Sequence, residues 1–380
     1  ILSFKYYRKM GNRKVVWKLV SILATINLFF CSCGEEKRYF KGDVVTIDTF
    51  DKEMTLKGTK VDLRDIYEGR PFVCDSFLIF NSFQCPDYYF YAFDLRSGKH
   101  VASFCPKGDG PEDYLSCDES AQLIKENGDN KIWVRDYNKQ KIHLINITQS
   151  IIQQKTICDS IIPFEWTKHF AYPLLSVFFL DDGSMLGINQ CEESPATSGN
   201  GYTPRDLYLF KESFDNKIRE YHLYQSPVIS LDDKVKFECF EFYNAVYRIR
   251  PNCTQLAIAM KMLAQVSVVD IETGEQRNYR MKESLTYPDI EKDIYKSRRY
   301  YETMAVNDQY IFALYVDAVM KDVPPPYSSH VIHVLTWNGE PAYKIHVDES
   351  IRYITLDTFG DTLYAIDVAD NLYSYDISRL

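Results

Sequence analysis

A β-hairpin motif recurs along this 380-residue chain at multiples of one spacing. Residues 93–99 and 269–275 each begin as an alternating apolar strand, turn at a glycine and start a second strand, and residues 335–340 repeat this pattern more loosely. The first two turn glycines, Gly98 and Gly274, are 176 residues apart, close to three times 58, and Gly339 follows 65 residues later. Regular repeats of this length indicate a fold built from similar supersecondary units.

A second recurring segment places an aromatic residue among small or branched apolar residues, as expected of a buried strand. Its copies are residues 132–136, 311–315 and 363–367. Dividing the 348 residues from Cys33 onward by 58 gives six units, with further hairpins expected near Asn146, Lys211 and Asp376 and unit ends near 105, 158, 224, 282, 348 and 380. The repeats therefore predict an all-β fold, a six-bladed β-propeller with four strands per blade.

The last unit is one strand short. After Ser350 only three strands are expected, at 353–359, 362–368 and 371–377. We expect the strand at 44–48 to supply the fourth, so that an N-terminal strand pairs with the last blade, closes the ring and removes the exposed sheet edges. A pair of β-sandwiches is the alternative, although it would not explain the threefold spacing of matching hairpins. Residues 288–301, rich in charge, are expected to form a short helix or a long loop between the fourth and fifth blades.

Residues 10–33 resemble a bacterial lipoprotein signal peptide. Basic residues at positions 13, 14 and 18 precede an apolar run of 12 residues, and Ser32 directly precedes Cys33. A membrane-spanning helix needs ~20 apolar residues, which makes an uncleaved anchor the weaker alternative. We expect an upstream extension and signal peptide at 1–32, lipid attachment at Cys33, a tether at 33–41 and the propeller at 42–380.

The composition agrees with a large β domain. Hydrophobic residues make up 46% of the chain and aromatic residues 15%, including 29 Tyr and 23 Phe, which supplies a large core and favours strands. The net charge of −9 argues against nucleic acid or an anionic lipid surface as a partner. We expect a monomeric outer-membrane lipoprotein, anchored by its N-terminal lipid, that faces either the periplasm or the cell surface.

No motif for catalysis or metal binding is apparent. The sequence has no nucleophile elbow, no His-Glu-x-x-His and no phosphate-binding loop, and His330 and His333 should point to opposite faces of one strand. We expect no catalytic residue, no cofactor and no metal. The cysteines after Cys33 form no pair with zinc spacing and should be mostly buried free thiols, with at most one or two disulfides. They are Cys74, Cys85, Cys105, Cys117, Cys158, Cys191, Cys239 and Cys253.

The segment 107–113 combines Gly108, Gly110 and Pro111 with several carboxylates. Glycine and proline are sufficient to form a turn, so we expect a structural turn there. A calcium loop is the alternative, but the segment lacks the alternating ligand positions of an EF-hand.

Two long polar loops, at 191–206 and 320–329, are the candidate binding loops. Loops on a rigid scaffold often carry function, and isolated aromatic or basic side chains in them suit contact with a carbohydrate or a peptide. The candidate contact residues are Tyr202, Arg205 and Tyr327. A simple variable connection is the alternative for both loops.

Three further segments, 107–112, 250–254 and 310–315, occur in this order behind the signal. Together with the repeats they make the chain resemble the TolB-like six-bladed propeller lipoproteins of Gram-negative bacteria over almost the whole mature body. The resemblance implies a fold and a location in the cell envelope, but no reaction. We expect a non-enzymatic propeller binding module for a protein, peptide or glycan; the alternative is a glycan-directed hydrolase or lyase on the same scaffold.

Overall fold

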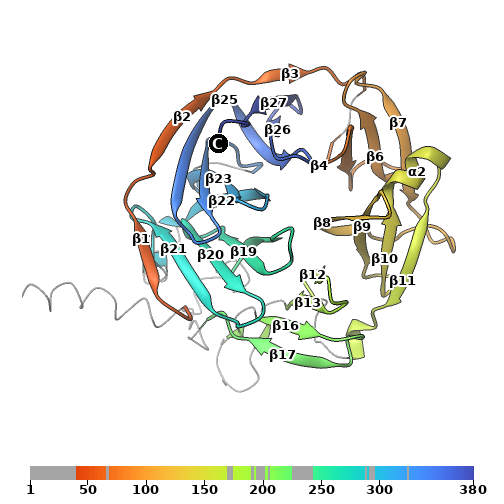
Figure 1. Cartoon of the computed structure of the whole chain (residues 1–380), viewed down its shortest axis with the longest axis horizontal. Helices are drawn as coiled ribbons and strands as arrows, with labels where there is room; N and C mark the ends of the chain where they lie inside the picture. Colours follow the sequence, from red (N-terminus) through yellow and green to blue (C-terminus); the bar gives the residue numbers. More distant parts are fainter. Residues whose placement is uncertain are drawn as a thin grey trace, which may run out of the picture.

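The computed structural model describes residues 40–65, 68–168, 174–189, 192–193, 202–203, 206–224, 243–286, 289–290, 296–322 and 325–380, with 119–121, 192–193 and 202–203 described by their backbone alone. These residues form an all-β structure in which successive antiparallel sheets surround a common centre, the arrangement of a β-propeller (Figure 1). No helix among them is long and apolar enough to span a membrane.

Four sheets are separate from one another. The first contains β4 (Arg70–Cys74), β5 (Phe77–Asn81), β6 (Tyr88–Asp94) and β7 (His100–Pro106). The second contains β8 (Asp118–Glu126), β9 (Asp129–Asp136), β10 (Lys141–Asn146) and β11 (Cys158–Pro163). The third contains β12 (Ser176–Phe179), β13 (Met185–Ile188), β16 (Leu207–Phe210) and β17 (Lys217–Tyr221), and the fourth contains β18 (Ala245–Ile249), β19 (Gln255–Met260), β20 (Gln265–Asp270), β21 (Gln276–Met281) and β1 (Val44–Ile47). A small ladder of β14 (Glu192–Glu193) and β15 (Tyr202–Thr203) falls between β13 and β16 in sequence.

The last two predicted units are joined in one eight-stranded sheet, so six separate blades are not observed. This sheet contains β22 (Arg298–Val306), β23 (Tyr310–Val319), β24 (Ser329–Thr336), β25 (Pro341–Leu356), β26 (Thr362–Asp367), β27 (Leu372–Asp376) and β3 (Thr59–Val61), with β2 (Lys52–Leu56) beside β25. The reason is that β25 runs unbroken for 16 residues. Its first half pairs with β24 and its second half with β26.

The strand expected to close the ring is in a different place. Residues 44–47 form β1, which pairs in parallel with β21 and not with the last strands of the chain. The closing strand is β3, which pairs antiparallel with β27, with Val61 opposite Leu372. Ile47 is buried against residues of β21, whereas Val61 packs against a core shared by the first and last sheets. Strands β1, β2 and β3 thus follow the outer rim of the ring (Figure 1).

The predicted hairpins are confirmed in their details. The Asp94 side chain accepts a hydrogen bond of 2.7 Å from the Ser97 amide, and Asp270 accepts one of the same length from Thr273. Both turns end at a glycine in the left-handed region: φ is 65° at Gly98 and 72° at Gly274. Residues with a Cβ adopt this conformation only at a higher conformational energy. The two β-turns are therefore structural copies of each other.

One connection agrees with the expectation in part, and another differs. Within 288–301, Asp289 and Ile290 lie in a helix and Lys296 in a 3-10 turn, but the segment from Arg298 onward already belongs to β22. Near Asn146, a helix, α2 (Ile147–Gln153), replaces the expected hairpin. The Asn146 side chain accepts a hydrogen bond from the Gln149 amide and caps this helix, a signal that was present in the sequence.

The proposed lipid-attachment residue Cys33, the signal peptide and most of the tether lie outside the described residues. The last two tether residues belong to the folded body. Phe40 is fully buried against Tyr224, and the Lys41 amide donates to the Leu223 carbonyl over 3.1 Å.

Candidate functional site

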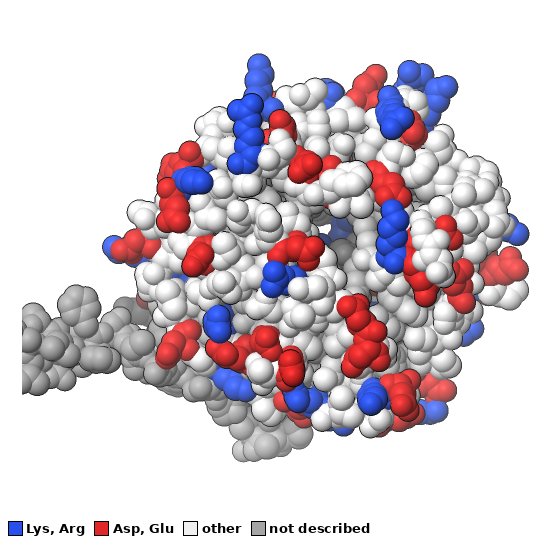
Figure 2. All heavy atoms as spheres, viewed as in Figure 1, with Lys and Arg blue, Asp and Glu red and all other residues white. Residues whose placement is uncertain are grey.

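The strands nearest the centre of the ring are the first strands of the sheets, together with β25 of the eight-stranded sheet. Strand β18 contacts β8 and β22, and β25 contacts β4 and β22. Because β4 and β22 each open an up-and-down sheet, they run in the same sense and begin at the same end of the ring. Arg70 begins β4, Arg299 is the second residue of β22, and Lys261 follows the second strand of its sheet at this same end. Figure 2 shows one face of the ring, which has a hollow near its middle with Lys or Arg atoms inside it.

We name Arg70, Lys261, Arg299 and Glu302 the basic cluster. Glu302 lies between two of the cations: its Oε1 is 3.6 Å from Lys261 Nζ, and its Oε2 accepts a hydrogen bond of 2.6 Å from Arg299 Nε. Only 18% of the Lys261 side chain and 9% of the Arg299 side chain are exposed. Lys261 and Arg299 therefore share one carboxylate in a largely desolvated site, where charges interact more strongly than in water.

Burial lowers the pKa of Lys261 to about 8. The Glu302 carboxylate opposes this shift, while the charges of Arg299 and Arg70 lower the pKa further by repulsion. Arg70 belongs to the first sheet and Lys261 to the fourth, so the electrostatic interaction spans the centre of the ring. The ammonium group is held in an environment that disfavours its charge, and an anion bound beside it would relieve that cost.

Tyr327, predicted as a loop contact, is buried beside the basic cluster. The Arg299 guanidinium lies 5.3 Å from the centre of its ring, and only 9% of Tyr327 is exposed. This cation–π contact orients Arg299. Tyr202 is described by its backbone alone, opposite Glu193 in the small ladder, and Arg205 lies outside the described residues. Their role in binding stays a prediction.

The segment around Gly108, Gly110 and Pro111 is a closed turn. The Asp113 carboxylate accepts a hydrogen bond of 3.0 Å from the Gly110 amide, and a side chain at Gly108 or Gly110 would meet this carboxylate at 2.5 or 2.6 Å. Lys139 Nζ donates to the carbonyl oxygens of Gly110 and Asp113 over 2.7 Å each. An ammonium group thus occupies oxygens that a calcium ion would need.

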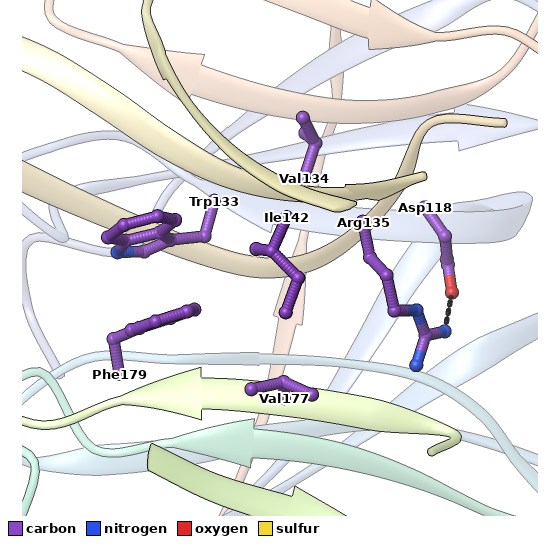
Figure 3. A pocket seen from close by; sticks show the side chains of 7 residues that line it. All are labelled: Asp118, Trp133, Val134, Arg135, Ile142, Val177 and Phe179. Carbon is purple, nitrogen blue, oxygen red and sulfur yellow. Dashed lines mark hydrogen bonds and ion pairs between the residues drawn. The ribbon is translucent and has the colours of Figure 1, made fainter. Parts of the chain in front are cut away.

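A cavity of about 10 Å³ lies between the second and third sheets (Figure 3). Arg135 Nη2 bonds to the Asp118 carboxylate and donates to the Leu175 carbonyl over 2.9 Å, while its Nε and Nη1 have no partner among the described residues. On the other side of the cavity, the rings of Trp133 and Phe179 stack with their centres 3.8 Å apart. This volume admits at most one water molecule, so the cavity belongs to the contact between sheets.

Burial disfavours the charged forms of several cysteines and of one histidine. The six described cysteines, 74, 85, 105, 117, 158 and 253, are free thiols, and burial raises the pKa of Cys74, Cys117 and Cys253, the last to about 11. His333 is buried against Tyr315, and burial lowers its pKa to about 3. These thiols are protonated and this imidazole is neutral at physiological pH, which suits core packing better than nucleophilic catalysis.

The basic cluster was missed in the sequence, although one signal was present. Lys261 interrupts the apolar run from Leu256 to Ala264, in which the neighbouring methionines are fully buried. A lysine inside a buried run needs a partner or a function, because a desolvated charge is costly. The carboxylate partner, Glu302, and the neighbouring Arg70 lie far away in sequence and could not be assigned.

Comparisons with known proteins establish a fold and no family. No protein-family model matches the chain, and no curated protein matches it. A member of the DUF4221 family from Bacteroides vulgatus has a similar crystal structure, with a TM-score of 0.55 at 13% identity, covering 90% of this chain and 98% of that one. A candidate exported protein of Bacteroides fragilis gives a TM-score of 0.48 at 14% identity over 87% and 97% of the two chains. The β-propeller domain of Cps50 from Myceliophteria thermophila gives 0.40 at 10% identity over 85% and 82%. The first of these shows that the chain shares a fold with a Bacteroides protein.

Proposed function

We propose that this chain is a cell-envelope lipoprotein whose propeller is a non-enzymatic binding module for a protein, peptide or glycan that carries acidic groups. The observation that supports the ligand chemistry is the basic cluster: the two largely buried cations Lys261 and Arg299 share the one carboxylate of Glu302 in a chain of net charge −9, and the charge of Arg70 also acts on Lys261. The local charge is opposite to that of the whole molecule. Such a site attracts an anionic group through its positive electrostatic potential and through hydrogen bonding.

The geometry suits a carboxylate. An arginine presents a planar fork that matches a carboxylate with two parallel hydrogen bonds. Arg299 is already oriented by Glu302 and Tyr327, so little side-chain entropy remains to be lost on binding. Arg70 is exposed at the start of β4 and adds a second guanidinium to the charges near Lys261. An anion near Lys261 would also raise the pKa of this lysine and recover part of its desolvation cost.

The finer features belong to the same proposal. We infer that β25 serves two blades, as the outer strand of one and the inner strand of the next, which would give six blades of a TolB-like type. Lipid attachment at Cys33 would place the protein at the outer membrane as a monomer, facing the periplasm or the cell surface. Tyr202 and Arg205 would extend the contact with the ligand beyond the basic cluster.

Binding of defined acidic probes tests the proposal. We expect the purified chain to bind oligogalacturonate or a glutamate-rich peptide in isothermal titration, and to bind neutral oligosaccharides or a glutamine-rich peptide more weakly. Lys261→Gln and Arg299→Gln should each weaken the acidic interaction about tenfold or more, since each removes a charge-assisted hydrogen bond. Lys125→Gln is the control, because Lys125 pairs with Asp75 on exposed surface at the opposite end of the ring. Equal affinity for acidic and neutral probes would refute the proposed ligand chemistry.

A glycan-directed lyase or hydrolase is the second candidate, favoured by the pKa of about 8 at Lys261. A lysine with this pKa is neutral often enough to accept a proton near physiological pH. Incubation with polygalacturonate, followed by an assay for new reducing ends, separates the two candidates. Product formation that disappears in Lys261→Gln would favour the enzyme, and binding without product would favour the module.

A further inference from the structure

A second group of polar side chains lies at the edge of the third sheet, outside the basic cluster. Asp206 directly precedes β16, and His222 directly follows β17. The last backbone pair of this ladder is Leu207 with Tyr221, and the next is Tyr208 with Glu220. Asp206 and His222 are therefore cross-strand neighbours, and Glu220, two residues before His222, lies on the same face.

Their potential ligand atoms converge. His222 Nδ1 is 3.2 Å from Asp206 Oδ2 and 4.0 Å from Glu220 Oε1, and one ligand atom from each residue lies within 4.8 Å of the others. Glu220 uses its other oxygen, Oε2, to pair with Lys217 over 2.9 Å. This pairing orients the glutamate and leaves Oε1 directed at the imidazole.

Asp206 supplies an independent observation, a buried carboxylate oxygen without a hydrogen-bond partner among the described residues. Only 7% of its side chain is exposed, and its Oδ1 has no hydrogen-bond partner among the described residues. The partner of Oδ2 is an imidazole, which carries charge only when protonated. A buried carboxylate with an unpartnered oxygen is costly unless a positive charge or a metal compensates it.

The backbone of Asp206 is held in place before any ligand binds. Asn189 Oδ1 accepts a hydrogen bond of 2.5 Å from the Asp206 amide, and Asn189 Nδ2 donates to the Tyr208 hydroxyl over 3.0 Å. These contacts connect β13 to the start of β16. A site built on paired strands and supported in this way needs little rearrangement to bind an ion.

We propose that Asp206, Glu220 and His222 bind one divalent transition-metal ion, with zinc as the best fit. One imidazole nitrogen and two carboxylate oxygens form a mixed ligand set that zinc accepts, whereas calcium and magnesium prefer oxygen ligands alone. His222 is 65% exposed and Glu220 33%, so the outer side of the ion stays open to water or to a donor from a bound molecule. Open coordination is typical of sites where the metal contacts a ligand.

Equilibrium dialysis of the full chain against zinc chloride, with the bound metal measured by mass spectrometry, tests the site. We expect one zinc per chain, and a loss of affinity of about tenfold or more in His222→Ala and in Asp206→Asn. His346→Ala is the matched control, since His346 is also partly exposed and faces one carboxylate, Glu53, at 3.7 Å. The visible spectrum of a cobalt-substituted sample should change in His222→Ala and not in His346→Ala.

Substoichiometric zinc in the unsubstituted chain, or zinc retained in both site variants, would overturn the proposal. Thermal unfolding shows whether each variant is folded, and His222→Ala changes an exposed side chain, so it serves as the test even if Asp206→Asn does not fold. Binding of oligogalacturonate in the presence of EDTA separates this site from the basic cluster. We expect EDTA to leave that binding unchanged. A chain that fails to bind oligogalacturonate both with and without EDTA would refute the proposed function and leave the metal site standing.

Discussion

At the scale of single residues, Lys261 is the clearest case of a side chain that reduces stability. We expect Lys261→Met to raise the free energy of unfolding at neutral pH by about 1–2 kcal/mol, because an apolar side chain of similar length avoids the desolvation cost. The same substitution should weaken binding of acidic probes. Urea denaturation and isothermal titration measure the two effects. If the charge of Lys261 is functional, the substitution should raise the stability and lower the affinity. A fall in both the stability and the affinity would identify Lys261 as a structural residue.

The pH dependence of Lys261 gives a second prediction. Its pKa in the folded protein, about 8, is below the usual 10.5, so between these values the unfolded chain binds more protons than the folded one. The free energy of unfolding therefore increases as the pH rises over this window. This increase should be absent in Lys261→Met. Binding of an anion should weaken over the same window as the ammonium loses its proton. Urea denaturation and isothermal titration at several pH values check both trends. If the free energy of unfolding depends on pH in the same way in the unsubstituted chain and in Lys261→Met, the lowered pKa does not belong to Lys261.

At the scale of elements, the turn glycines are not equivalent. Gly339 has a φ of 81°, and a Cβ there would lie 1.9 to 2.2 Å from ring atoms of Tyr279, which belongs to the neighbouring sheet. Gly128 has a φ of 88°, with nothing within 4 Å of such a Cβ. We expect Gly128→Ala to cost about 1 kcal/mol for the left-handed backbone alone, and Gly339→Ala about 2–4 kcal/mol because the ring must move as well. Equal decreases in the free energy of unfolding of the two variants, measured by urea denaturation, would show that the Tyr279 ring can move without an energetic penalty.

Most elements could be predicted from local patterns, and the exceptions have a physical cause. The hairpins around Gly98 and Gly274 depend on turn chemistry within seven residues, so the repeats revealed them. The continuity of β25 was not visible, because Asp348, Glu349 and Ser350 resemble a turn while the paired strands on both sides keep them extended. The basic cluster and the Asp206 site depend on contacts between strands that are distant in sequence.

At the scale of the whole molecule, closure of the ring depends on a short strand and a shared core. β3 pairs with β27, and Val61 packs against a cluster formed by Val73, Leu78, Phe80 and Phe93 of the first sheet and Ile366 and Leu372 of the last. The Asp75 amide also donates to the Thr358 hydroxyl across this joint over 2.8 Å. Strand β4 therefore depends on closure for part of its support, and β4 carries Arg70 of the basic cluster.

Val61→Asp tests this dependence. Placing a carboxylate against the shared core should lower the free energy of unfolding by about 2–3 kcal/mol, since the charge has no partner there. Hydrogen exchange should show the earliest loss of protection in β3, β27 and β4, with β18 to β21 protected for longer, because opening at the joint is local. Affinity for acidic probes should fall as well, through the displacement of Arg70. Lys57→Asp is the control, because Lys57 is exposed just before the same strand. A uniform loss of protection around the ring would mean that closure and core unfold together, and that the joint has no separate role in holding the basic cluster.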